Sequence, residues 1–231
     1  MVVKKRTTLK KILIIIFSYI LSIVIIFYFI SYLHFHRRIE NPTYSNGINA
    51  VWIQHSWVGI SHPEMKYTNF ANLLKKNKIT DVFIHVGPLD AEGIIRERKY
   101  KYAKKLINEL SKIYPKLTKQ AWIGQVEKKG GGSLDLSDLK TRINIVKTAE
   151  KFINIGFNGI HYDIEPIHTN NKSFIDLLIR THEITLRHNK ILSIACPLLE
   201  PLYGLHFIVD LFPSGAIWTK KYYKEVSKYV D

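Results

Sequence analysis

Five apolar stretches with the composition of buried β-strands alternate with stretches of helical periodicity, and this alternation limits the possible folds most strongly. The strands are predicted near residues 50–54, 81–86, 121–126, 156–166 and 191–196, and the helices between them near 67–77, 102–113, 137–155 and 174–188. A further helix is predicted over 218–228, and residues 229–231 have the composition of the start of a sixth strand. Regular strand–helix alternation is typical of parallel βαβ units, in which helices cover near-continuous apolar strands.

Two architectures fit this pattern, an open doubly wound sheet and a (β/α)8 barrel. Polar residues collect at the ends of several predicted strands, as barrel enzymes require of their active sites. These residues are His55, His85, Gln125, Asp163 and Glu165. No phosphate-binding glycine pattern follows the first strand, so the predicted fold class is α/β of the (β/α)8 TIM-barrel type. Residues 46–231 hold about five βα units, whereas a full barrel needs roughly 250 residues, so we expect an incomplete, C-terminally shortened barrel.

The N-terminal region contains 22 residues without a charge, Ile12 to Leu33, which is long enough to cross a bilayer as a helix. Basic residues precede this run, and no small-residue cleavage site follows it, so we expect an uncleaved anchor rather than a signal peptide. The basic excess predicts a cytoplasmic N-terminus and an extracellular domain, in a single-pass protein of the cell membrane. The predicted organisation is a basic segment 1–11, a transmembrane helix 12–33, a tether 34–46 and a barrel domain 47–231.

The charge and cysteine content restrict the possible partners. The formal net charge is +15, and from residue 39 onward 27 Lys and Arg against 19 Asp and Glu leave +8. The lysines are scattered without a basic-aromatic module, so no nucleic-acid partner is predicted; a basic surface suits an anionic cell envelope. The single cysteine, Cys196, excludes an intrachain disulfide, and its apolar surroundings predict a buried core thiol rather than a nucleophile.

The fourth predicted strand carries the chemistry. Gly156 is placed to end the preceding helix, and Ser137 to begin it. Because side chains alternate along a strand, His161, Asp163 and Glu165 share one face. The other face, predicted to meet the helix layer, carries Ile160, Tyr162 and Ile164. The carboxylates of Asp163 and Glu165 stand two residues apart on this face and repel each other. The repulsion raises the pKa of one of them, as a general acid requires.

The segment Gly159-Ile-His-Tyr-Asp-Ile-Glu165 resembles the fourth-strand signature D-G-x-D-x-D-x-E of glycoside hydrolase family 18, the chitinase-like barrels. The four acidic positions of that signature fall on Asn158, His161, Asp163 and Glu165, of which the last two match. The resemblance implies that Glu165 is the proton donor and that Asp163 orients the N-acetyl group of the substrate and stabilises the oxazolinium ion. It also implies an N-acetylated polysaccharide or oligosaccharide substrate and no cofactor. His161 changes the charge balance beside Asp163 and is placed to hydrogen-bond it.

Four residues are predicted to contact the substrate: His161, Trp57, His85 and Gln125. Trp57 either stacks on a sugar ring or packs in the core, and His85 either faces the site or is a core histidine. Two other functions stay open, a non-catalytic glycan-binding or vestigial hydrolase-like protein and a metal-dependent hydrolase. Residues 47–231, the predicted barrel domain, contain no H-E-x-x-H and no paired H-x-H, so no metal ligands are predicted.

Overall fold

The computed structural model describes residues 2–35, 47–212 and 215–231 and contains two compact units, residues 1–45 and 46–231. The described residues of the first unit form helix α1 (Val2–Phe35). Within α1, residues Lys10–Leu33 are long and apolar enough to cross a membrane, a test that a signal sequence also passes. The predicted tether lies mostly in residues 36–46, outside the described residues.

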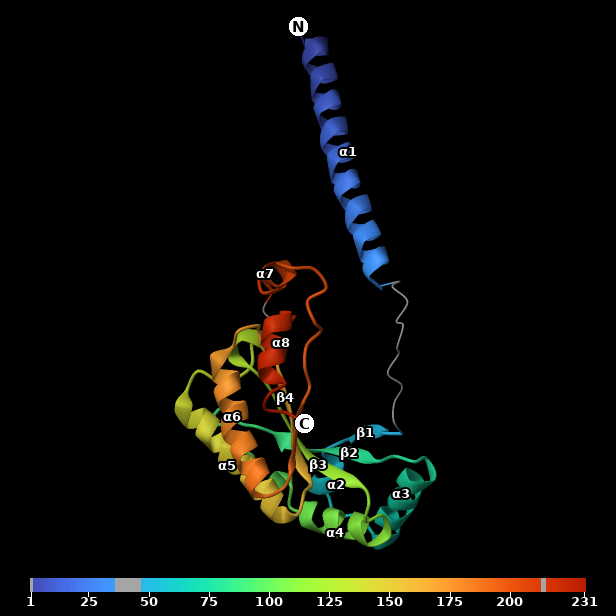
Figure 1. Cartoon of the computed structure of the whole chain (residues 1–231), viewed down its shortest axis with the longest axis vertical. Coiled ribbons are helices and arrows are strands. Elements are labelled where there is room, and N and C mark those ends of the chain that lie inside the picture. The colour runs from blue at the N-terminus through green and yellow to red at the C-terminus, as the bar shows by residue number, and fades with distance from the viewer. Residues whose placement is uncertain (1, 36–46, 213–214) are drawn as a thin grey trace. The chain divides into compact units, whose positions relative to one another are not determined.

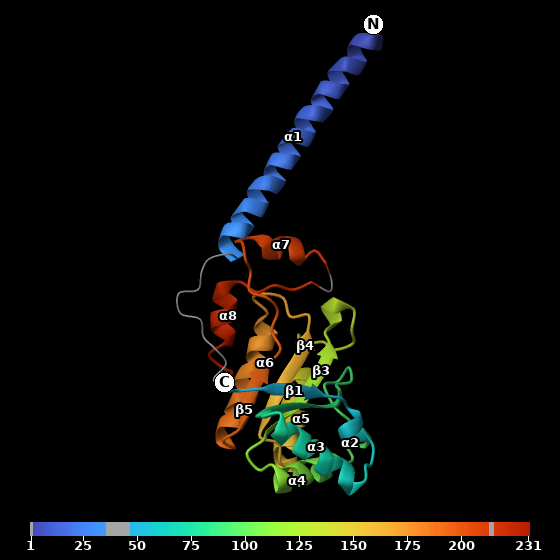
Figure 2. The same ribbon diagram turned by 90° about the vertical axis from the view of Figure 1, so that its right-hand side faces the viewer.

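The second unit is built on a parallel five-stranded sheet whose order along the sheet, β1-β2-β3-β4-β5, is also the order along the chain. The strands are β1 (Ala50–Ile53), β2 (Asp81–Pro88), β3 (Thr118–Val126), β4 (Gly159–Glu165) and β5 (Ile191–Ile194). A doubly wound sheet reverses its strand order at a switch point, and this sheet does not. In Figure 2, β3 and β4 run toward the end of the unit where α7 lies. The predicted incomplete barrel-type fold is therefore confirmed.

Helices connect successive strands and cover the outer face of the sheet (Figure 1). They are α2 (Ser56–Gly59), α3 (Glu64–Lys76), α4 (Ala103–Ile113), α5 (Leu139–Ile155) and α6 (Lys172–Arg187), with 3-10 turns η1 (Glu97–Lys99) and η2 (Lys128–Gly130). Helices α7 (Leu205–Val209) and α8 (Lys220–Val226) follow β5. The outward strand residues Ile84, Ile123 and Ile160 are fully buried under this layer. Tyr162 is buried with them, and its hydroxyl pairs with Thr181 Oγ1 of α6 at 2.9 Å.

The ends of α5 set the entry into β4. Gly156 ends the helix in a left-handed conformation (φ 117°), as predicted, and its N–H bonds to Ile153 O and Phe152 O. The predicted N-cap Ser137 is wrong by one residue, because the Asp138 carboxylate accepts the Lys140 and Thr141 N–H groups. A carboxylate at this position also interacts favourably with the positive end of the helix dipole.

The edge formed by β5 differs most from expectation. The predicted burial of Cys196 is wrong: β5 ends at Ile194, and Cys196 is exposed beyond it. Residues 229–231 form no strand, but the N–H of Asp231 donates to Leu192 O at 2.9 Å and its carboxylate accepts from Leu192 N–H at 2.8 Å. Asp231 thus caps part of the β5 edge, where exposed backbone groups otherwise invite further strand pairing.

Burial of the outer face of β4 should contribute to the stability of the second unit. Replacing the fully buried Ile160 by Ala removes three methyl or methylene groups and leaves a cavity, so we expect unfolding to become easier by about 3 kcal/mol. Urea unfolding of the full chain in detergent measures this loss. The exposed Lys151→Ala change on α5 is the control, and equal stability of the two variants would contradict this assignment of the core.

Candidate active site

The register of the sheet brings inward side chains of β2 to β5 together. Trp122 pairs with His85 on one side and His161 on the other, and Gly124 and Val126 pair with Asp163 and Glu165. Paired residues of neighbouring strands face the same side of the sheet. The burial of Ile160, Tyr162 and Ile164 confirms the predicted alternation in β4, with His161, Asp163 and Glu165 on the inner face.

His161 lies deepest on this face and is 4% exposed. The Ser193 hydroxyl donates to Gln120 Oε1 at 2.7 Å, so the Ser193 oxygen accepts from His161 Nδ1–H at 2.8 Å. The hydrogen bond from His161 to Asp163 that the sequence suggested is thus replaced by one to Ser193. Burial lowers the pKa of His161 to about 4, so the ring is neutral near pH 7.

Asp163 is held by a residue that sequence reasoning missed. Trp122 Nε1–H donates to Asp163 Oδ2 at 2.8 Å. Gly124 makes room for this pair, because a Cβ there would lie 3.0 Å from the Asp163 backbone oxygen and 3.4 Å from Trp122 Nε1. Alternation within β3 was the signal available, since it places Trp122 on the same face as the inward residues of β4. The bond occupies one carboxylate oxygen of Asp163.

Glu165 is the last residue of β4, and its side chain is exposed. Partial burial raises the pKa of its carboxyl, and the negative charge of Asp163 raises it further. The direction of this shift is the one that the sequence predicts for the strand's two carboxylates. A carboxyl with a raised pKa keeps its proton closer to neutral pH, as a general acid must.

Glu165 borders two hollows. One, of about 270 Å³, also contains His85, Trp122, Gln125 and Asp163 among its lining residues. The other, of about 600 Å³, is mainly apolar and is lined by Val126, Gly130, Glu165, Pro166, Cys196, Pro197, Leu198 and Ala216. The lining of the smaller hollow is also mainly apolar, so what distinguishes it for a ligand lying across Glu165 is the second carboxylate, Asp163.

Two of the predicted contacts, His85 and Gln125, line the smaller hollow. The His85 ring lies 4.7 Å from the Trp122 ring and 5.9 Å from the His55 ring. Burial lowers the pKa of His85, His55 lowers it further, and Asp163 opposes the shift. The Gln125 amide donates to Leu89 O, and its oxygen accepts the Val126 N–H at 2.8 Å, so this side chain braces the strand ends.

Trp57 does not belong to this group, which corrects the sugar-stacking interpretation. Its ring stacks on Phe70 at 4.3 Å, and Lys66 Nζ lies 5.0 Å above it. Helix α2 begins at Ser56, directly after β1, and carries Trp57 into the helix layer. The packing alternative is the one that the structure shows.

The described residues hold no group of three or more His, Cys, Asp or Glu side chains that converge as metal ligands do. His161 bonds to Ser193, and His55 and His85 contact each other edge to face. The metal-dependent alternative therefore finds no donor set in this part of the chain.

Comparison with known proteins places the fold. No protein-family model and no curated protein matches the chain. The solved structures that it resembles include the spore cortex-lytic enzyme SleL of Bacillus cereus, with a TM-score of 0.52 and 19% identity over 80% of this chain and 40% of that one. They also include a chitinase from Chromobacterium violaceum, with a TM-score of 0.52 and 11% identity over 80% of this chain and 54% of that one.

These similarities define the second unit as a barrel-type fold of the kind found in chitinases. At such low identity they concern the fold alone. The chain spans about half the length of these structures or less.

The repulsion between the two carboxylates can be measured directly. Replacing Asp163 by Asn removes the negative charge that raises the pKa of Glu165, so we expect that pKa to fall toward its usual value. Carbon-13 NMR titration of the glutamate carboxyls measures the shift. Asp135→Asn, in the loop after β3, is the control; an unchanged Glu165 pKa in the Asp163 variant would contradict the coupling.

Burial of neutral His161 should make stability depend on pH. The folded-state pKa of about 4 lies below the ordinary 6.5, so the unfolded chain binds the proton first as the pH falls. The free energy of unfolding should therefore be highest above pH 6.5 and decline toward pH 4, by up to about 3 kcal/mol. Urea unfolding across this range should show a smaller decline in His161→Asn, and parallel curves would contradict the assignment.

Proposed function

We propose that this chain is a membrane-anchored, glycoside hydrolase-like protein that acts on N-acetylated glycans by substrate-assisted acid catalysis. The observation that carries the proposal is the pair on the inner face of β4. Glu165 stands at the mouth of the site, the end of β4 beside the two hollows, and the pKa of its carboxyl is raised. Asp163 lies two residues deeper, with one oxygen held by Trp122. The chitinase-type fold and the signature-like sequence of β4 support the same chemistry.

In this mechanism protonated Glu165 donates its proton to the glycosidic oxygen while the bond to the anomeric carbon breaks. The acetamido oxygen of the substrate attacks the anomeric carbon, giving an oxazolinium ion. Asp163 accepts the acetamido N–H through its free oxygen, because Trp122 occupies the other, and its charge stabilises the cation. Water then attacks the anomeric carbon and returns a proton to Glu165. Neutral His85 lies in the same hollow, where it can hydrogen-bond a sugar hydroxyl.

The catalytic role of Glu165 is tested by hydrolysis of a fluorogenic N-acetylglucosamine oligomer with the full chain. Glu165→Gln keeps the shape and removes the proton, so we expect the rate to fall by roughly 100-fold or more. Glu64→Gln on the exposed start of α3 should leave it unchanged. An inactive parent, or an active Glu165 variant, would remove the catalytic proposal.

The membrane anchor and its orientation have their own test, because Cys196 is the single cysteine and is exposed. If the second unit lies outside the cell, a membrane-impermeant maleimide should label Cys196 in intact cells. A Thr8→Cys variant in a Cys196→Ser background should be labelled only after permeabilisation. The reverse pattern would place the second unit in the cytoplasm.

A non-catalytic glycan-binding protein is the second candidate. It is favoured by the openness of the inner face at the β1 edge, where the Trp52 side chain is 54% exposed. Catalysis of this kind benefits from exclusion of water, whereas binding does not need it. Retained affinity of Glu165→Gln for an N-acetylglucosamine oligomer, with a parent that does not hydrolyse it, supports this candidate.

A further inference from the structure

The segment around α7, in the excursion between β5 and α8, has an inverted pattern of burial. In and beside α7, the buried residue is the polar His206, whose Nδ1 lies 2.7 Å from Glu200 Oε1, with both side chains less than 10% exposed. Large apolar side chains point outward instead. We call them the α7 patch: Tyr203 (96% exposed), Phe207 (67%), Ile208 (58%), Leu211 (78%) and Phe212 (62%).

The α7 patch is continuous because its residues follow helical spacing. Phe207, Ile208 and Leu211 stand three and four residues apart, and the N–H groups of Leu211 and Phe212 continue the turn by bonding to Ile208 O and Val209 O. The Glu200–His206 pair holds the opposite side of the helix. An apolar stripe held toward solvent in this way marks a surface that meets an apolar phase or a partner.

The composition of the excursion favours a lipid surface. Residues 197–219 contain no Lys or Arg, in a chain with 34 of them. Lysines stand at its borders: Lys129 lines a hollow with Asp210 and Leu211, and Lys220, Lys221 and Lys224 follow on α8. An apolar stripe rich in Phe, Leu and Tyr with bordering lysines is typical of segments that lie in the interface of an anionic bilayer.

The length of the chain next to α1 makes the bilayer accessible. Residues 36–46 reach roughly 40 Å when extended, and a unit of this size is also roughly 40 Å across. If α1 spans the membrane, a chain of this length lets the second unit turn different faces toward the surface. From residue 39 onward the chain carries a net charge of +8, which favours anionic headgroups.

We propose that the α7 patch docks the second unit on the membrane surface by inserting Phe207, Ile208 and Leu211 into the lipid interface. This inference rests on the membrane-anchoring part of the proposed function. In Figure 2, α7 lies at the end of the unit toward which β3 and β4 run. Docking therefore turns the mouth beside Glu165 toward the lipid headgroups and favours glycans held close to the bilayer.

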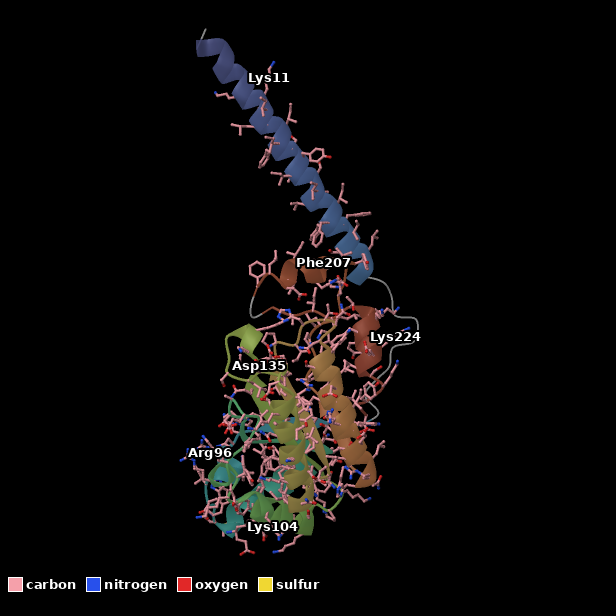
Figure 3. The ribbon with its side chains drawn as sticks, turned by 90° about the vertical axis from the view of Figure 1, so that its left-hand side faces the viewer. Lys11, Arg96, Lys104, Asp135, Phe207 and Lys224 are labelled. Carbon is pink, nitrogen blue, oxygen red and sulfur yellow. The ribbon has the colours of Figure 1, made fainter. Side chains whose placement is uncertain are left out.

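The test uses the full chain with Cys196→Ser and a fluorophore on a Phe207→Cys substitution. Lys104→Cys on α4 is the matched control, and Figure 3 shows these two positions at opposite ends of the second unit. The protein is reconstituted in phosphatidylcholine–phosphatidylglycerol vesicles with or without brominated acyl chains. We expect brominated lipid to reduce the Phe207 label's emission to roughly half and to leave the Lys104 label unchanged.

Each result decides the proposal. Equal emission of the two labels, or a Phe207 signal that follows the protein-to-lipid ratio and not bromination, overturns it; the latter assigns the patch to a second copy of the chain. Adding Leu211→Asp should abolish the quenching without changing thermal unfolding, because Leu211 is exposed. Flotation after alkaline extraction tests the anchor separately, and a chain that does not float still reports through Phe207 whether the patch meets added vesicles.

Discussion

The parallel hydrogen-bonded register of β3, β4 and β5 is the constraint on which the rest of the second unit depends. It fixes which residues of β4 face the helix layer, where Ile160 and Tyr162 are fully buried, and which face inward. A slip of one residue would bring His161 and Asp163 into the apolar core and expose the isoleucines. The cost of burying those groups unpaired makes this register strongly specified.

The exposure of the inner-face residues increases along β4. His161 is buried and neutral, Asp163 is half-buried, and Glu165 is exposed at the mouth. Neighbouring strands hold one atom of each deeper group: Ser193 accepts from His161 Nδ1–H, and Trp122 donates to Asp163 Oδ2. Glu165 is left to the two hollows that it borders. The chemistry of the site therefore follows from how far each residue lies along the strand.

The segment around α7 has the opposite pattern of burial from the outer face of the sheet. On the outer face of the sheet, apolar side chains such as Ile160 and Tyr162 are buried, whereas the segment around α7 buries the hydrogen-bonded Glu200–His206 pair and exposes its apolar stripe. The two patterns coexist because Glu200 and His206 are hydrogen-bonded to each other, which lowers the cost of burying these two polar groups. The exposed stripe is not buried on folding. Its burial in another phase can therefore still stabilise association.

The sequence by itself determined the order of strands and helices, the barrel-type sheet, the left-handed end of α5 at Gly156 and the shared face of His161, Asp163 and Glu165. Each of these depends on local periodicity or on one residue's conformational freedom. Only the tertiary structure decided that Trp122 holds Asp163, that His161 bonds to Ser193, that Trp57 packs on Phe70 and that Cys196 is exposed. These contacts join residues of different elements or depend on where a strand ends, and the spacing of residues along the chain carries no direct record of either.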